Sequence, residues 1–119
     1  MKRNSRSIDK PAQTLRSLAL QFPAAEEGIA CAGTASEKRT IKVRGKAFLF
    51  LGANDLMLKV RDSLPEATDA ASRAAGEVVV GIRGWITVKN LDLIPLAQLV
   101  RWLHESYRLF APKKLIPPE

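Results

Sequence analysis

The sequence has very little cysteine and histidine, with one residue of each, Cys31 and His104. A single cysteine excludes an intramolecular disulfide and cannot supply a thiolate cluster for zinc or iron. A zinc-protease helix would need a second histidine four residues after the first, but residue 108 is an arginine. We therefore expect no metal and no cofactor. Cys31 is interpreted as a small hydrophobe at the end of a strand, in a protein of a reducing compartment.

Long hydrophobic runs are also missing. The longest apolar runs, 47–53 and 78–82, are far shorter than the roughly 20 residues that cross a bilayer. The basic residues within 1–10 are followed by neither a sustained apolar stretch nor a small-residue cleavage site, so a secretory signal is not expected. These absences predict a cytoplasmic protein that does not associate with membranes.

Recognisable catalytic patterns are absent as well. The sequence contains neither the glycine-rich phosphate loop that ends in Lys-Ser/Thr nor the Gly-x-Gly-x-x-Gly fingerprint. Ser106 follows His104 closely, but a hydroxyl without an oriented base is not a nucleophile. The adjacent acids Glu26 and Glu27 are expected to point to opposite sides of a strand, so they do not form a carboxylate pair on one face. We expect no enzymatic activity.

Positive charge is in excess. The 119 residues include 19 Lys and Arg against 12 Asp and Glu, which gives a net charge of +7, and 46% of the residues are hydrophobic. That hydrophobic content is typical of one globular core. The charge creates a long-range field that attracts polyanions, and by itself it does not choose among nucleic acid, anionic membranes and acidic proteins.

Three segments have the pattern of helices. Apolar residues recur at three- and four-residue spacing from the expected cap Asp9 to Phe22, where Pro23 ends the pattern. The same spacing runs from the expected cap Asp92 to Phe110. The alanine-rich segment 64–75 suits a short helix between them.

Alternating apolar residues predict five strands, at 27–32, 40–51, 55–61, 78–82 and 86–88. Gly45 offers a place for the long second strand to bend or bulge, and Arg83–Gly84 is a tight turn between the last two strands. The fold predicted is a two-layer α+β sandwich, with an antiparallel five-stranded sheet and helices on one face, in the order α-β-β-β-α-β-β-α. One domain is expected at 9–112, between a flexible basic arm at 1–8 and a loose tail at 113–119.

Six short segments, which are spread along nearly all of the chain after residue 15, occur in a recognisable order: Phe22–Pro23, Lys42–Phe48, Leu58–Lys59, Trp85–Val88, Glu105–Tyr107 and Lys113–Leu115. In order and spacing they resemble the MmcQ/YjbR family. The resemblance implies the same order of elements, a layout similar to type III secretion chaperones, and a general shape related to frataxin. It also implies DNA binding through a double-wing type of motif. The alanine-rich segment 67–75 departs from the family's pattern, so no function is carried over to the middle helix.

If the strand alternation holds, the uncovered face of the sheet is basic and partly aromatic. The residues predicted to bind nucleic acid are Lys42, Arg44, Lys46, Lys59, Arg61, Arg83, Trp85 and Lys89, joined on that face by Phe48 and Phe50. Only Asp55 and Glu77 oppose this charge. Lysine and arginine neutralise phosphates and release counterions, while aromatic rings stack with exposed bases. The alternative is an ordinary polar sheet face whose aromatic residues close a second small cluster.

Two functional hypotheses follow. In the first, the chain is a non-catalytic module that binds DNA or another polyanion through the basic sheet face, with Arg83 touching phosphate from a wing tip. The Gly-Ile-Arg-Gly pattern around Arg83 is interpreted as a hairpin turn, because the similar RNA-clamping loop joins two helices. In the second, the chain is a protein-interaction or chaperone-like module that holds an acidic or amphipathic partner segment on the same sheet or on an exposed edge strand.

Overall fold

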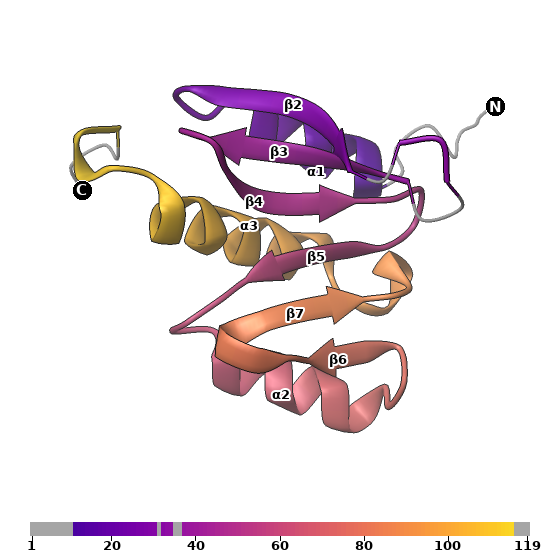
Figure 1. The fold of residues 1–119 in the computed structure, drawn as a ribbon. Coiled ribbons are helices and arrows are strands. Elements are labelled where there is room, and N and C mark those ends of the chain that lie inside the picture. Colours follow the sequence, from indigo (N-terminus) through magenta and orange to yellow (C-terminus); the bar gives the residue numbers. More distant parts are fainter. Residues whose placement is uncertain (1–10, 31, 35–36, 116–119) are drawn as a thin grey trace, which may run out of the picture.

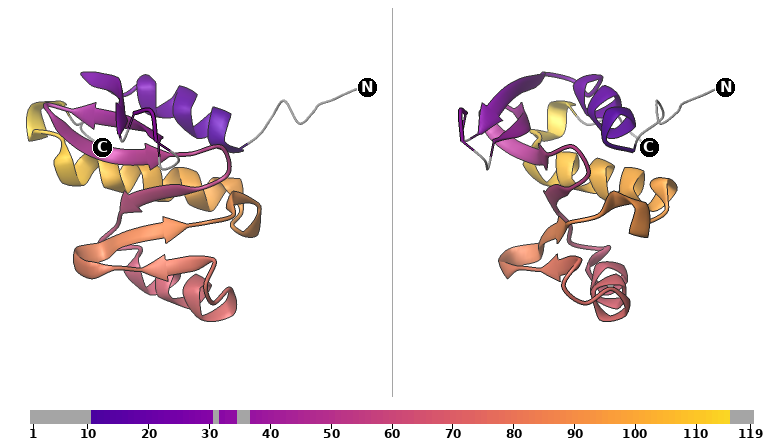
Figure 2. Two further views of the ribbon diagram at one scale, coloured as in Figure 1. Left: turned by 45° about the vertical axis from the view of Figure 1, so that its right-hand side comes forward. Right: turned by 90° about the vertical axis from the view of Figure 1, so that its right-hand side faces the viewer.

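The computed structural model describes residues 11–30, 32–34 and 37–115. The expectations for the basic arm, the Asp9 cap, Cys31 and residues 116–119 lie outside the described residues. Three helices pack on one face of an antiparallel sheet, which Figure 1 shows from its open side: α1 (Pro11–Leu20), α2 (Leu64–Arg73) and α3 (Leu96–Phe110). Viewed along the sheet, all three helices lie on the same side of it (Figure 2). The predicted α+β class with an antiparallel sheet is therefore confirmed.

The sheet has six strands in the order β2-β3-β4-β5-β7-β6. They are β2 (Ala25–Ala30), β3 (Lys38–Val43), β4 (Lys46–Leu51), β5 (Leu56–Lys59), β6 (Val78–Val80) and β7 (Trp85–Val88). The first strand begins two residues earlier than predicted. Strands β2 and β6 form the two edges of the sheet. Within the described residues, no helix is both long enough and apolar enough to cross a membrane.

The prediction of five strands was wrong because the long strand expected at 40–51 is a hairpin. Arg44 and Gly45, with φ of 52° and 83°, form the turn between β3 and β4. Positive φ at both central residues is typical of the two-residue turns whose twist matches a hairpin. The turn pairs Val43 with Lys46 and so exchanges odd and even positions between the two faces. Lys46 therefore projects on the same face as the buried Val43, the helix-covered one, and not on the open face as predicted.

A bulge at Phe48 then reverses that exchange, because Lys42 pairs with Ala47 but Ile41 pairs with Leu49. Odd-numbered positions beyond the bulge return to the helix-covered face. The sequence therefore shows an alternation that looks unbroken through both features.

The last helix begins later than predicted. Asp92 does not cap it but lies in a short 3-10 turn, η2 (Leu91–Leu93), where its backbone N–H donates to the side chain of Asn90. Ile94 is extended, with φ of −119° and ψ of 131°, as expected for a residue that precedes a proline. Helix α3 therefore starts at Leu96, directly after Pro95.

The core fills the space between the sheet and the helices. Its largest fully buried side chain is Trp102 of α3, and the same core contains leucine and isoleucine side chains of the central strands. The indole N–H of Trp102 donates a 2.7 Å hydrogen bond to the carboxylate of Glu66 on α2. Helix α2 contributes only alanines to the fully buried set, Ala67 and Ala70, and its small side chains let it pack closely beneath β6.

Candidate nucleic-acid interface

Strand register decides which of the predicted binding residues meet. Val43 pairs with Lys46, and Lys59 pairs with Trp85, so the end of β3, the start of β4, the end of β5 and the start of β7 lie at one end of the sheet. The β3–β4 turn, the segment after β5 and the β6–β7 turn lie at this end too (Figure 1). Helix α3 also ends here, followed by the short turn η3 (Lys113–Leu115).

We call this region the basic end, and it contains nine cationic residues: Lys42, Arg44, Lys46, Lys59, Arg61, Arg83, Arg108, Lys113 and Lys114. The last three were not among the predicted site residues. Their proximity to the first six depends on where α3 ends relative to the sheet. The sequence does show that these three cations follow one another at the end of the last helix. It does not show which strand ends lie beside the end of that helix.

The cations of the basic end have no carboxylate partners in the described part of the chain. The ion pairs found there all lie elsewhere: Arg16 and Arg39 with Glu27, Lys38 with Asp55, Arg73 with Asp69, and Arg101 with Glu66. Glu26 lies opposite Lys42 in the strand register, without a salt bridge. The positive potential of the basic end is therefore left to counterions or to an anionic ligand.

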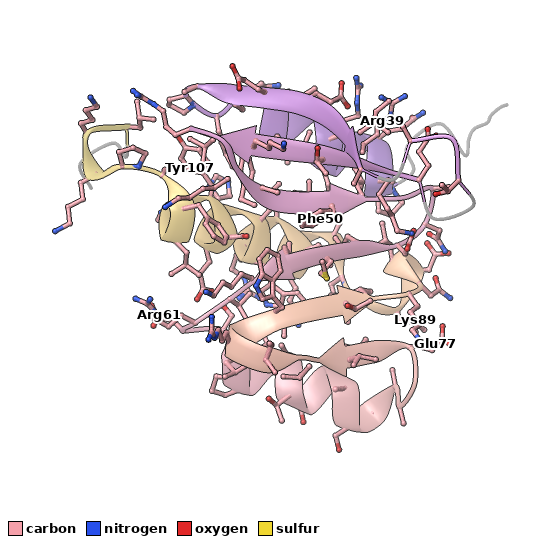
Figure 3. All side chains as sticks on the ribbon, in the orientation of Figure 1. Arg39, Phe50, Arg61, Glu77, Lys89 and Tyr107 are labelled. Atoms are coloured by element: carbon pink, nitrogen blue, oxygen red, sulfur yellow. The ribbon has the colours of Figure 1, made fainter. Side chains whose placement is uncertain are left out.

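Lys89 does not belong to the cluster, contrary to the prediction. It follows β7 at the opposite end of the sheet, where its backbone N–H donates a 2.7 Å hydrogen bond to the carbonyl oxygen of Glu77. Figure 3 shows Lys89 and Glu77 together, with Arg61 on the other side of the molecule. The sequence suggested a shared face because strand alternation reports faces of a sheet and says nothing about its two ends.

Two of the cations are held at turn tips in an uncommon backbone conformation. Arg44 and Arg83 have φ of 52° and 56°, in the left-handed region that glycine and asparagine occupy more easily. Next to Arg83, Gly84 approaches the sheet so closely that a Cβ there would lie 2.2 Å from the carbonyl oxygen of Val60. The carbonyl of Gly84 accepts a 2.9 Å hydrogen bond from the N–H of Val60, which fixes the β6–β7 turn beside β5.

Aromatic side chains extend from the basic end across the open face. The rings of Phe50 and Trp85 have centroids 6.1 Å apart, and Phe110, at the end of α3, lies 5.8 Å from Trp85. The ammonium group of Lys59 is 5.7 Å from the centroid of the Phe110 ring. Phe50 and Trp85 thus occupy the predicted face. Phe110 joins them from α3, a helix that the strand alternation in the sequence did not associate with this face.

Phe48, which was predicted to join this face, is fully buried on the helix-covered side. The bulge at this residue turns its ring toward α3. There it contacts Tyr107 and Phe22, with centroid distances of 5.3 Å and 6.0 Å. Phe50 and Trp85, together with Phe110, form a small half-buried aromatic cluster on the open side, as the alternative describes, whereas Phe48 belongs to a separate cluster on the covered side.

Three consecutive residues of α3 fasten the helix to the basic end. The hydroxyl of Ser106 donates to the carbonyl oxygen of Phe48 and accepts from the backbone N–H of Lys59. The Tyr107 hydroxyl donates a 2.8 Å hydrogen bond to the carbonyl oxygen of Pro23. These residues belong to the segments that carry the family resemblance, and their observed role is to hold the architecture around the cations.

The third residue, Glu105, binds the backbone between β5 and α2. Its carboxylate accepts hydrogen bonds from the N–H groups of Arg61, Asp62 and Ser63. Burial raises the pKa of Glu105, but these hydrogen bonds together with that of the Ser63 hydroxyl outweigh burial and hold the pKa below its ordinary value. The ionised carboxylate is therefore directed at the backbone and forms no ion pair with the neighbouring cations that the structure describes.

The remaining polar residues of interest have structural partners. His104 lies on the exposed side of α3, with its ring centroid 4.9 Å from that of Phe22. The partial shielding of the imidazole from water, and after it the charge of Arg108, lowers the pKa of His104. Glu27 binds Arg16 on the helix-covered side, whereas Glu26 pairs with Lys42 on the open side, as predicted. In the described residues, no group of three His, Cys, Asp or Glu side chains is arranged to hold a metal ion.

Comparison with known proteins identifies the family. A model of the YjbR family matches residues 20–109, from the last residue of α1 to the last turn of α3. No curated protein sequence and no solved structure gives a significant match to the chain. The matched region covers more than half of the sequence and includes five of the six segments that carry the resemblance. The chain belongs to the YjbR family.

Proposed function

We propose that this protein binds DNA through the basic end, by contacting phosphates and without strong readout of base identity. The supporting observation is the convergence of nine cations, from strands, turns and a helix end that are distant in sequence, with no ion pair among them in the described structure. The nine cations outnumber the carboxylates that the structure describes nearby, which are Glu26, Asp62 and Glu105, and form no ion pairs with them. The excess of like charges is repulsive, and a polyanion relieves that repulsion while releasing its own counterions.

The dimensions of the basic end suit a polyanion. Its cations lie on or beside β3, β4, β5 and β7, which are neighbours in the sheet. Strands are spaced at about 4.8 Å, so the row extends for roughly 14 Å. Duplex DNA carries one charge per about 1.7 Å of its axis, and several phosphates therefore fall within reach of such a row.

The backbone at the two turn tips also supports this proposal. A left-handed conformation costs an ordinary L-residue about 1–2 kcal/mol, and asparagine or glycine would occupy these positions at less cost. Arginine nevertheless occupies both tips at the basic end, at Arg44 and Arg83. Residues in strained conformations are concentrated at binding sites, where the side chain and not the backbone is what matters.

The salt dependence of binding tests the proposal. The affinity for a DNA fragment should fall with a log-log slope of about −0.9 for each duplex phosphate contacted. Replacement of Lys42, Arg44 and Lys46 by glutamine should flatten this slope by about one for each phosphate that the variant no longer binds. The matched control replaces Arg39, Arg73 and Lys89, which removes the same charge away from the basic end. An unchanged slope in the first variant, or an equal change in both, would reject the basic end as the binding surface.

A protein-interaction function is the second candidate, and one feature of the sheet favours it. The edge strand β6 exposes Val79, with 41% of its surface accessible, and the turn that follows exposes Ile82, with 79% accessible. Apolar side chains beside an unpaired strand edge can receive an extended partner segment. Binding of such a partner should survive nuclease treatment and high salt. It should be lost in Ile82→Lys but retained in the variant with glutamine at Lys42, Arg44 and Lys46.

A further inference from the structure

The open face carries a row of rings that the proposed electrostatic contacts do not use. Phe50, Trp85 and Phe110, which we call the aromatic floor, are each half-buried. The floor is wide at its centre because Phe50 pairs with Met57, and Met57 with Thr87, on the same face. Phe110 reaches this face where pairing between β4 and β5 stops, beyond Leu49 and Leu58. Figure 1 shows the two strands diverging at that point, with the end of α3 beside them.

The position of the floor among the cations indicates the chemistry of its ligand. Lys59 lies over Phe110 and pairs with Trp85, and Lys42 lies on the same face two strands away. A ligand that covers the rings and reaches these ammonium groups must carry flat apolar groups and negative charges close together. The bases and phosphates of nucleic acid have this arrangement, and base–aromatic stacking accepts any base because every base has a π-face.

The tilt of the rings distinguishes a single strand from a duplex. The planes of Phe50 and Trp85 are inclined by 63°, and those of Trp85 and Phe110 by 36°. Rings at such angles cannot extend one continuous helical stack, so each can receive only a base that has left its neighbours. In a duplex the base faces are hidden inside the stack, whereas an unpaired strand can turn its bases outward.

We propose that the aromatic floor stacks the bases of single-stranded DNA while the basic end holds its phosphates, so that the protein prefers an unpaired strand to a duplex. This preference rests on the proposed DNA binding. DNA is favoured over RNA because most of the floor is apolar, and only the indole N–H of Trp85 and the hydroxyl of Thr87 could bind a ribose 2′-hydroxyl there. A 2′-hydroxyl lying on the phenyl rings or Met57 would give up its bound water without compensation.

The two tryptophans provide a direct signal of stacking. Trp85 is half-buried on the open face, whereas Trp102 is fully buried in the core. A base stacked on Trp85 should quench the fluorescence of that indole and shield it from acrylamide. Neither a bound base nor acrylamide reaches Trp102, so its fluorescence should stay constant during the titration.

The experiment compares the full chain with four labelled ligands at one salt concentration: oligothymidylate, an abasic strand of equal length, the oligothymidylate–oligoadenylate duplex, and oligouridylate. Oligothymidylate should bind at least about fivefold more tightly than the abasic strand, which corresponds to one stacked base at the low end of measured stacking. It should also bind more tightly than the duplex and oligouridylate, and only ligands with unpaired bases should quench Trp85.

Variants assign the preference to the floor. Trp85→Ala should lower the affinity for oligothymidylate toward that for the abasic strand and leave the salt slope unchanged, while Trp85→Phe should retain most of the difference. If Trp85→Ala does not fold, the comparison of ligands with the unaltered protein decides the question. Equal affinity for oligothymidylate and the abasic strand, or tighter binding of the duplex or of RNA, would overturn the stacking proposal and leave the electrostatic one standing. Absence of binding to all four ligands would reject both.

Discussion

The hydroxyl of Ser106 donates a 2.6 Å hydrogen bond to the backbone carbonyl oxygen of Phe48, the residue at the β4 bulge. The same hydroxyl accepts from the N–H of Lys59 at 3.1 Å. One side chain of α3 thereby satisfies two backbone groups on neighbouring strands, at the place where those strands stop pairing with each other. The arrangement of the basic end consequently depends on the position of α3.

Removal of this hydroxyl should destabilise the fold. Ser106→Ala leaves a carbonyl and an N–H group without partners at a fully buried site, and each such group costs about 1–3 kcal/mol. We expect a lower midpoint of urea unfolding with an unchanged slope. Ser72→Ala on the exposed side of α2 is the matched control and should unfold like the unaltered protein. Equal midpoints for the two variants would show that Ser106 does not hold the sheet.

Glu105 should make stability depend on pH in acid. Its folded-state pKa lies below the ordinary value of 4.5, so the unfolded chain binds more protons there. The stability that this carboxylate supplies is fully present above about pH 4.5 and is lost as the pH falls through the folded-state pKa. Glu105→Gln should be less stable at neutral pH and should lose less stability than the unaltered protein on acidification. Urea unfolding at pH 3 to 6 measures both effects, and parallel curves for the two proteins would contradict the assignment.

The arginines at the two turn tips should move stability and binding in opposite directions. Asparagine accepts the left-handed conformation of Arg44 and Arg83 more readily, so each substitution should stabilise the fold by at most about 1–2 kcal/mol. Loss of the guanidinium groups should at the same time weaken DNA binding and reduce its salt slope. Lys46→Asn is the control, since it removes charge from β4 without relieving a positive φ. If the asparagine variants lose stability, or if they bind DNA as tightly as the unaltered protein, Arg44 and Arg83 do not have the proposed role in DNA binding.

His104 should titrate below its ordinary pKa of 6.5, because burial against the Phe22 ring and then the charge of Arg108 disfavour the imidazolium. Since the folded-state pKa is depressed, the unfolded chain binds the proton more readily, and stability should fall as the pH drops through 6.5. The NMR signals of this single histidine report its pKa directly. In His104→Gln, the stability change between pH 7 and pH 5.5 should disappear. A pKa at or above 6.5 would contradict the prediction.

Periodic patterns in the sequence were sufficient for the general fold. The helical spacing up to Phe22 and up to Phe110 located two helices, and alternation around Leu58 and Ile86 located central strands, because burial on one face imposes these periods on the sequence. The first residue of a helix was harder to predict from the sequence. The proline at 95 outweighed a plausible cap at Asp92, because the residue before a proline avoids the helical region.

The candidate site was only partly predictable, for a geometric reason. Alternation places Phe50, Lys59 and Trp85 correctly because it reports the face of a strand. It does not report which strand ends meet, so Lys89 was included and Arg108 was left out. It also does not detect a turn and a bulge that cancel each other, and for that reason Phe48 was assigned to the wrong face.

The most direct test of DNA binding by the basic end is a map of backbone amide shifts during titration with DNA. We predict that the largest changes occur in the β3–β4 turn, at Lys59 to Arg61 and in the β6–β7 turn. The amides of Lys38, Asp55 and Lys89, at the opposite end of the sheet, should remain unchanged. Changes concentrated at that opposite end, or no changes at DNA concentrations that saturate the salt-dependent binding, would contradict the proposal.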